Sequence, residues 1–252
     1  MAKTTPNSEA HRYARQTVLE DWGAKGQTRI AASSALIIGL GGLGAPILTY
    51  LAGAGVGTIT LNDFDTIDIT NLPRQPTFTQ ADVGNAKASV AAEFLRARNP
   101  TITTRAIDQR LNATELESEV RNHDLVLDAT DHFGSRFAIN TASVATQTPH
   151  IAAAAIRYAG HVVAFDRRTP NVPCYACIYG EDDMVDGTCA GQGVFPPLVG
   201  LVGSMAAAAA LRLMLNDPVD ERTLLHCVDA QTLAVRAVAV ERQSGCPVCS
   251  SL

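Results

Sequence analysis

The chain has 252 residues, of which 46% are hydrophobic and 5% aromatic, and its formal net charge is −5 at pH 7. This length accommodates one large α/β domain or two small ones, and so few aromatic residues suit helices packed on a sheet better than an aromatic-rich β-sandwich. The net negative charge argues against a general nucleic-acid binder, because contacts to phosphates require clustered Lys and Arg side chains.

Short β-branched runs alternate with helical stretches over residues 33–170, which predicts βαβ units around a parallel sheet. Asn112 followed by Glu115 has the spacing of a capping box and predicts a helix start. The other predicted elements of this part, in chain order, are a strand at 35–40, a helix at 44–54, a strand at 58–63, a helix at 82–98, and strands at 101–107 and 124–130.

The pattern changes after residue 155, where strands are predicted at 160–166, 223–229 and 232–241. Loops, cysteines and one long helix that begins near Leu198 separate these strands. We therefore expect an antiparallel C-terminal extension of the same sheet. The predicted fold class is α/β, with a doubly wound, mainly parallel, Rossmann-like sheet.

Residues 194–211 carry no charge and are about as long as a minimal membrane span. However, this stretch contains two prolines and two glycines, is rich in alanine and is followed by Arg212, which favours a helix buried in a soluble core. Residues 1–16 contain no apolar segment of the kind found in secretory signals. We expect a cytoplasmic protein that binds no membrane.

The stretch IIGLGGLGAPI contains three glycines in the spacing G-x-G-x-x-G, namely Gly39, Gly41 and Gly44. Such a turn lets backbone N–H groups and a helix N-terminus approach a phosphate. Asp63 lies 19 residues beyond Gly44 at a predicted strand end, about where a ribose-binding acid belongs. The turn alone does not separate NAD from ATP, and a tight turn without a ligand remains an alternative.

The next segment adds Asp65, Asn71 and Arg74, and Lys87 follows in GNAKA. A hydride-transfer site has little use for several cations beyond the pyrophosphate bridge. A triphosphate attacked at its α-phosphorus needs them, because charge accumulates on the reacting and leaving oxygens. This pattern favours ATP, although solvated charges on a long surface loop would also produce it.

Asp128 and Asp131 lie around the C-terminal end of the predicted strand at 124–130. Ligands bind at this edge in open parallel sheets. Asp131 is a candidate ligand of Mg²⁺, which prefers oxygen ligands. It is also a candidate N-cap of the helix that follows, and the two roles are compatible.

Four of the six cysteines form two CxxC pairs separated by a long insert: Cys174, Cys177, Cys246 and Cys249. Paired CxxC motifs in a chain without a predicted secretory signal favour a tetrahedral zinc site that holds the C-terminal tail, with two redox pairs as the alternative. Cys227 is predicted to be a buried, small apolar residue of a strand. Cys189 lies in a Gly-rich loop and is a candidate nucleophile.

These motifs occur in the same order along nearly the whole chain as in the ThiF/MoeB/HesA family, which the sequence closely resembles. The series is RYARQ, GLGGLG, GAGVGTITLNDFD, NLPRQ, DVGNAKA, LDATD, PCYAC, GVFPPLVGLVGS and CPVC. Members of this family are bacterial adenylyltransferases related to ubiquitin-activating enzymes. The resemblance implies a mixed sheet of about eight strands in a single adenylation domain over 1–252, with an N-terminal helical arm (1–32), a zinc-held tail (246–252) and a homodimeric state.

The resemblance also implies an activity, namely ATP-dependent adenylation of the C-terminal glycine of a ubiquitin-like sulfur-carrier protein ending in Gly-Gly. A separate sulfur-donor protein would then supply the sulfur. The implied cofactors are Mg²⁺ and structural Zn²⁺. The implied nucleotide-binding residues are Gly39, Gly41, Gly42, Gly44, Asp63, Asp65, Asn71, Arg74, Lys87 and Asp131. Among them the resemblance places Asp63 on the ribose, Arg74 and Lys87 on phosphates and Asp131 on Mg²⁺. Arg15 is implied to reach the ATP of the partner subunit. Cys189 stands where some members carry a persulfide- or thioester-forming cysteine.

The chain departs from the family at a few positions. His132 stands where Asn is usual, Pro73 replaces a polar residue, and MAAAAALRLML replaces a pattern that often contains Glu. Three alternatives remain open at this point. They are an NAD-dependent oxidoreductase, a non-catalytic scaffold, and a family member that acts on a carboxylate outside a carrier protein.

Overall fold

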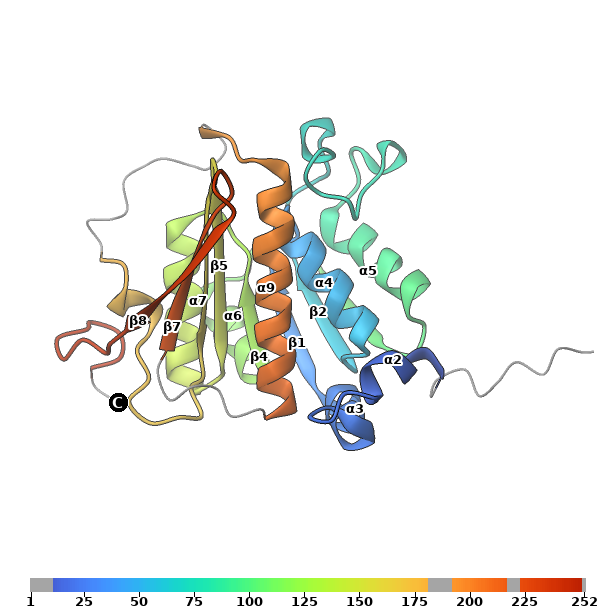
Figure 1. The fold of residues 1–252 in the computed structure, drawn as a ribbon. Helices are drawn as coiled ribbons and strands as arrows, with labels where there is room; N and C mark the ends of the chain where they lie inside the picture. The colour runs from blue at the N-terminus through green and yellow to red at the C-terminus, as the bar shows by residue number, and fades with distance from the viewer. Residues whose placement is uncertain (1–10, 181–191, 217–222, 251–252) are drawn as a thin grey trace, which may run out of the picture.

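The computed structural model describes residues 11–180, 192–216 and 223–250. The strands form one eight-stranded sheet. Helices pack against it (Figure 1). The strands are β1 (Ser34–Ile38), β2 (Thr58–Asn62), β3 (Thr103–Ile107), β4 (Leu125–Asp128), β5 (His150–Ile156), β6 (Ala159–Phe165), β7 (Thr223–Asp229) and β8 (Ala234–Val240). The helices are α2 (Ala14–Thr17), α3 (Gly23–Ala32), α4 (Gly44–Ala54), α5 (Lys87–Arg98), α6 (Ala113–Arg121), α7 (Phe133–Thr146) and α9 (Pro196–Leu215), with 3-10 turns at Ile69–Asn71, Gln80–Asp82 and Tyr175–Cys177.

The strand order is β3-β2-β1-β4-β5-β6-β7-β8. Strands β1 to β5 pair in parallel, and β6, β7 and β8 continue the sheet in antiparallel fashion. This arrangement confirms the predicted mainly parallel sheet with an antiparallel C-terminal extension. The order reverses between β1 and β4, and ligands of doubly wound sheets bind outside the carboxyl ends of the strands at such a point.

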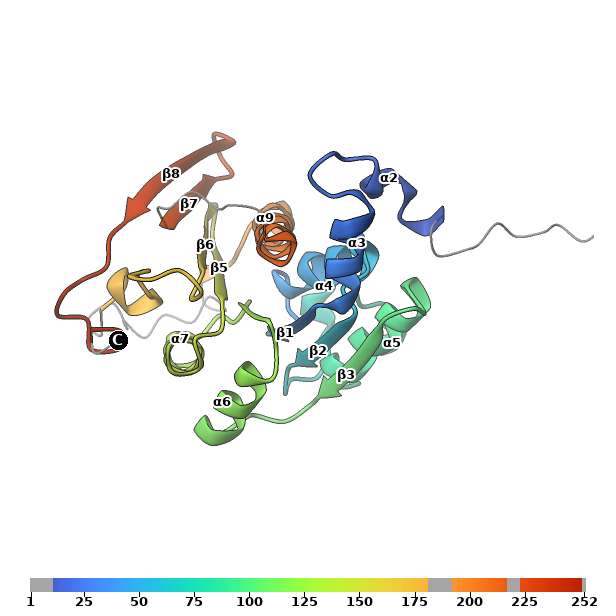
Figure 2. The same ribbon diagram turned by 90° about the horizontal axis from the view of Figure 1, so that it is seen from below.

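The central strands of the sheet are covered on both faces, as Figure 2 shows. Helices α4, α5 and α9 pack on one face, against side chains that include Ile37 and Leu61. Helices α6 and α7 pack on the other face, against Leu36 and Val126. Because β1 is buried on both faces, its sequence is continuously apolar rather than alternating.

Helix α9 is the one described helix that is long and apolar enough to cross a membrane. It instead supplies the core, because Leu198, Val202 and Ala206 are fully buried and the helix packs on α4, β5 and β6. Two prolines stand in its first turn, where the missing N–H group costs nothing. The prediction of a core helix is confirmed, with a start two residues earlier than expected.

Two of the element boundaries that differ from the sequence prediction have identifiable reasons. Strand β1 ends at Ile38 because Gly39 adopts a left-handed conformation with φ of +89° and turns the chain. The helix predicted at 82–98 begins only at Lys87, because Gly84 is left-handed and Ala86 forms a β-bridge with Thr66. Lys87 therefore lies in the first turn of α5.

Candidate functional site

The glycine turn connects β1 to α4 and is tightly packed on one side. A Cβ atom at Gly44 would lie 2.3 Å from the carbonyl oxygen of Gly39, and one at Gly39 would lie 2.7 Å from the carbonyl oxygen of Ala129. A Cβ at Gly41 would meet only the Gln75 side chain, at 3.5 Å. The turn therefore closes through Gly39 and Gly44, whereas Gly41 leaves room for a ligand to approach the backbone.

Asp63 follows β2 directly and joins the turn to the neighbouring loop. Its carboxylate accepts hydrogen bonds from Leu40 N at 2.7 Å and from Asp65 N at 2.9 Å. Burial raises the pKa of Asp63, although the charge of Lys87 and these two N–H groups oppose the rise. Each carboxylate oxygen keeps a lone pair, so Asp63 can also accept hydrogen bonds from ribose hydroxyls.

Lys87 brings a buried positive charge to the same edge of the sheet. Its side chain is only 8% exposed, and Nζ lies 2.9 Å from Oδ2 of Asp65, which is 54% exposed. The Lys87 N–H group also donates to the carbonyl of Asp65. Because water can solvate Asp65 when the ion pair opens, the Lys87 ammonium can exchange this partner for a phosphate group.

Arg74 and Asn71 lie in the loop that packs against the glycine turn. The Arg74 carbonyl would be 3.2 Å from a Cβ at Gly42, and the Arg74 guanidinium donates to Thr70 O at 2.8 Å. The Asn71 side chain accepts a hydrogen bond from Asp68 N and closes a capping box. Arg74 is half-buried and carries a positive charge beside the turn, and the side-chain oxygen of Asn71 is engaged within its own turn.

Asp131 lies between β4 and α7 and is exposed. No hydrogen bond or ion pair engages its carboxylate within residues 11–180, 192–216 and 223–250. The preceding residue, Thr130, donates to Oδ1 of Asp128 through its N–H group at 3.0 Å and its hydroxyl at 2.7 Å. Because Ala129 packs on Gly39, this segment holds Asp131 at the edge of the sheet that carries the glycine turn.

The structure thus brings the turn, Asp63, Asp65, Arg74, Lys87 and Asp131 to one edge, but it keeps Arg15 away. Arg15 is exposed in α2, and the adjacent Gln16 donates to Ala54 O at the C-terminal end of α4. The glycine turn is at the other end of this 11-residue helix, roughly 16 Å away. Cys189 lies outside the described residues.

The four cysteines of the paired motifs form a buried cluster. Their Sγ atoms all lie within 4.8 Å of one another, with 3.6 Å between Cys174 and Cys246 and 3.5 Å between Cys177 and Cys249. These separations exceed a disulfide bond and suit the edges of a tetrahedron of thiolates around a zinc ion. Burial opposes ionisation of Cys246, but the N–H groups of Cys249 and Val248 outweigh it and lower the pKa of Cys246 to about 7.

The fifth cysteine of the described residues, Cys227, differs from its prediction. It is half-buried in β7 rather than buried: it pairs with His161 and so points to the face of the sheet opposite α9, where α7 packs on β4 and β5.

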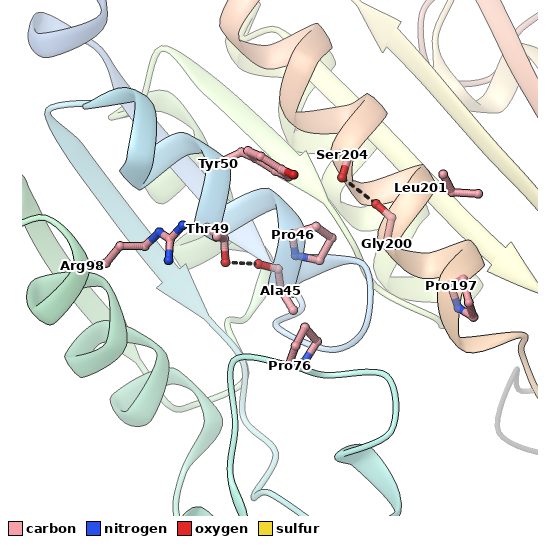
Figure 3. A pocket seen from close by; sticks show the side chains of 10 residues that line it. All are labelled: Ala45, Pro46, Thr49, Tyr50, Pro76, Arg98, Pro197, Gly200, Leu201 and Ser204. Carbon is pink, nitrogen blue, oxygen red and sulfur yellow. Dashed lines mark hydrogen bonds between the residues drawn. The ribbon is translucent and has the colours of Figure 1, made fainter. Parts of the chain in front are cut away.

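A separate hollow lies between α4 and α9, with a volume of about 500 Å³ (Figure 3). Tyr50 and Leu201 stand at it with 55% and 45% of their surface exposed. The other lining residues are Ala45, Pro46, Thr49, Pro76, Arg98, Pro197, Gly200 and Ser204. Its lining is mostly apolar and contains no carboxylate, so it does not resemble a site for Mg²⁺ and a triphosphate.

Arg136 and Tyr175 were not predicted from the sequence, and Arg136 contacts the residue before Asp131. Arg136 is 6% exposed, and its guanidinium donates to the carbonyl of Thr130. It also forms a hydrogen bond with the hydroxyl of Tyr175, a residue that lies between two of the clustered cysteines. The sequence does place an arginine five residues after Asp131, at the start of α7. Its site role could not be predicted, because its contacts depend on tertiary packing.

A family pattern and several known proteins match nearly the whole chain. The ThiF family pattern matches residues 13–248. The sulfur carrier protein ThiS adenylyltransferase of Escherichia coli K12 is 40% identical over 242 residues, which are 94% of either chain. The molybdopterin-synthase adenylyltransferase of Salmonella typhimurium LT2 is 38% identical over 248 residues, covering 96% of this chain and 97% of that one.

Solved structures of E. coli MccB have the same architecture. The structure with ATP has a TM-score of 0.79 at 23% identity, covering 98% of this chain and 75% of that one. The structure with AMPCPP and MccA has a TM-score of 0.80 at 24% identity, covering 94% and 74%. At this level of identity the likeness concerns the fold alone.

Proposed function

The chain belongs to the ThiF family, and from this premise we propose that it adenylates the C-terminal carboxylate of a small sulfur-carrier protein. It is an adenylyltransferase, since the curated relatives that it matches almost end to end are adenylyltransferases. The observation that carries the proposal is the meeting of the glycine turn, the cations and the Asp131 carboxylate at one edge of the sheet. An ATP molecule requires all three, whereas a nicotinamide dinucleotide requires mainly the turn.

Each side chain has a distinct part in this proposal. Asp63 would hold the ribose, the backbone around Gly41 would approach the phosphates, and Arg74 and Lys87 would neutralise the pyrophosphate that leaves. Asp131 would hold Mg²⁺, and its exposed carboxylate, which has no partner among the described residues, fits that ion. When bound, Mg²⁺ supplies charge stabilisation on the phosphate oxygens.

The reaction needs little proton transfer. The attacking group is a carboxylate that is already ionised at neutral pH. Its oxygen forms a bond to the α-phosphorus of ATP while the bond to the bridging oxygen breaks and pyrophosphate leaves. Alignment and electrostatic stabilisation of the transition state therefore supply the acceleration.

ATP–pyrophosphate exchange tests this function. We expect exchange only when a small protein ending in Gly-Gly is present together with MgATP. The matched control is the same carrier protein with its last glycine removed. Absence of exchange with every such carrier, or tighter binding of NADH than of MgATP in a fluorescence titration, would overturn the proposal.

We further propose that the active form is a homodimer in which Arg15 completes the site of the partner subunit. Arg15 is exposed at one end of α4 while the glycine turn lies at the other end. If two copies packed through the face formed by α4 and α9 around a two-fold axis, their α4 helices would run antiparallel. The C-terminal end of α4 in one copy, near Arg15, would then lie close to the glycine turn of the other copy. The exposed Tyr50 and Leu201 on this face supply apolar surface for such packing.

Mixing two inactive variants tests this arrangement. Arg15→Ala and Asp131→Asn should each abolish exchange alone, whereas their mixture should regain part of it, because a heterodimer contains one intact site. Light scattering should give the mass of two chains. A monomer, or a mixture without recovered activity, would overturn the proposal.

For the four-cysteine cluster we propose structural Zn²⁺. The cluster is buried and offers four sulfur ligands, so it has no open position for a substrate. Metal analysis of the purified protein should find one zinc ion per chain. A chain that folds with a normal melting temperature and without bound metal would contradict this role.

A further inference from the structure

The carboxylate of Asp131 has no side-chain partner in the described part of the chain, so its orientation depends on its backbone. Asp131 lies in a short segment between β4 and α7, and the residue before it is Thr130. The N–H group and hydroxyl of Thr130 are fixed on Asp128, whose side chain is fully buried. The remaining backbone group, the Thr130 carbonyl, belongs to the peptide bond that joins Thr130 to Asp131.

That carbonyl is held by Arg136. Arg136 projects from the first turns of α7 and is 6% exposed, and its Nη2 donates to the oxygen of Thr130. The charge of Arg136 also acts on Asp128, where it opposes the rise in pKa that burial causes. A guanidinium has five donors in one rigid plane, so it can hold several acceptors at once, which an ammonium group does less well.

The other contacts of this region lead to the four-cysteine cluster. Arg136 forms a hydrogen bond with the hydroxyl of Tyr175, which lies between Cys174 and Cys177. One helical turn further along α7, the Asn140 side chain accepts from Tyr175 N at 2.9 Å and donates to Cys174 Sγ at 3.5 Å. The middle of α7 therefore contacts the four-cysteine cluster through Asn140, and the start of α7 contacts the Asp131 segment through Arg136.

We propose that Arg136 is a positioning residue that ties the Asp131 segment to the four-cysteine cluster through Tyr175, and thereby sets the affinity of Asp131 for the divalent cation of the nucleotide. Arg136 touches neither nucleotide nor metal in this scheme. It acts on the peptide bond that carries Asp131. The inference rests on the proposed role of Asp131 as a metal ligand.

The test measures binding of Mn²⁺, a spectroscopic substitute for Mg²⁺, by electron paramagnetic resonance in the presence of α,β-methylene-ATP. Arg136→Gln should weaken Mn²⁺ binding by roughly 10- to 100-fold, the usual effect of losing a group that orients a metal ligand. Tyr175→Phe, which keeps the ring, should weaken it by roughly 2- to 12-fold, as expected for one hydrogen bond. The control is Arg121→Gln, an exposed arginine paired with Glu117 on α6, and it should leave binding unchanged.

Two comparisons separate positioning from loss of folding. The double variant Arg136→Gln with Tyr175→Phe should bind Mn²⁺ no more weakly than Arg136→Gln, because Tyr175 acts through Arg136. Arg136→Lys keeps the positive charge and should bind Mn²⁺ more tightly than Arg136→Gln does. This comparison remains informative even if Arg136→Gln folds poorly. Additive effects of the two substitutions, or equal losses in Lys and Gln variants that track their melting temperatures, would overturn the positioning role.

Asp131→Asn separates this inference from the function on which it rests. If Asp131→Asn weakens Mn²⁺ binding while Arg136→Gln and Arg136→Lys bind as the wild type, the inference fails and the proposed function stands. If Asp131→Asn binds Mn²⁺ as the wild type does, the proposed metal role of Asp131 fails, and with it the inference.

Discussion

Replacement of Lys87 by Met separates the contribution of its charge to catalysis from its contribution to folding. The side chain is 8% exposed, and Met has nearly the same shape, so packing around α5 is retained. Among the described residues the ion pair lost is the one with Asp65, which is 54% exposed and regains water when its partner is removed. Asp63, whose pKa the charge of Lys87 lowers, can take up a proton in the variant. The cost to the free energy of unfolding should therefore be about 1 kcal/mol or less.

The expected cost to catalysis is much larger. Lys87 is a preorganised, buried cation, and losing one group that stabilises charge in a transition state typically costs roughly 2.7–4 kcal/mol, or 10²- to 10³-fold in rate. ATP–pyrophosphate exchange should fall by this factor in Lys87→Met, while urea denaturation shows a nearly unchanged protein. Lys25→Met, at an exposed lysine of α3, is the matched control and should behave as the wild type.

Exchange in Lys87→Met within a few fold of the wild type would refute the assignment. So would a loss of activity that parallels a loss of folded protein. In either case the buried lysine would serve only to hold Asp65 and the loop that follows β2.

Other predictions concern the turn, the cluster and a buried histidine. Gly44→Ala should destabilise the fold by about 1–3 kcal/mol in urea denaturation, because its methyl group would meet the Gly39 carbonyl at 2.3 Å. Gly41→Ala should fold normally yet bind ATP more weakly by calorimetry, because its methyl group occupies the open side of the turn. Cys246→Ser should lose zinc in metal analysis and lower the melting temperature by several degrees, since one of four ligands is removed. Burial lowers the pKa of His150 to about 3, so the unfolded chain binds the additional proton below pH 6.5. The stability of the wild type should therefore fall by up to about 1.4 kcal/mol per pH unit from pH 6.5 toward pH 4, and His150→Gln should remove that part of the slope.

Elements with local signals were predictable from the sequence. The capping box of Asn112 and Glu115 forms as expected, with bonds of 3.0 and 2.9 Å, because all its atoms lie within one turn of helix. The apolar run before the glycine turn predicted β1, because a strand covered on both faces is continuously apolar. The paired cysteines were predictable as one cluster because a zinc site requires four ligands.

Features that depend on tertiary contacts were not predictable. The delayed start of α5 follows from a β-bridge between Thr66 and Ala86, which are distant in sequence. The partial exposure of Cys227 follows from its place on the sheet face opposite α9, where α7 packs on β4 and β5. Arg136 has an ordinary place in a helical pattern, and only the packing of α7 on the cysteine cluster reveals its contacts.

The position of β1 in the middle of the sheet has a consequence for synthesis of the chain. One edge of β1 pairs with β2 soon after both leave the ribosome, but the other edge waits for β4, and Ser34 meets its partner Asp124 across 90 residues. At roughly 5–20 residues per second this interval lasts about 5–18 seconds. During that time an apolar strand edge is open to pairing with other nascent chains. Slowed translation between residues 60 and 120 should therefore increase aggregation, and chaperones that cover strand edges should reduce it.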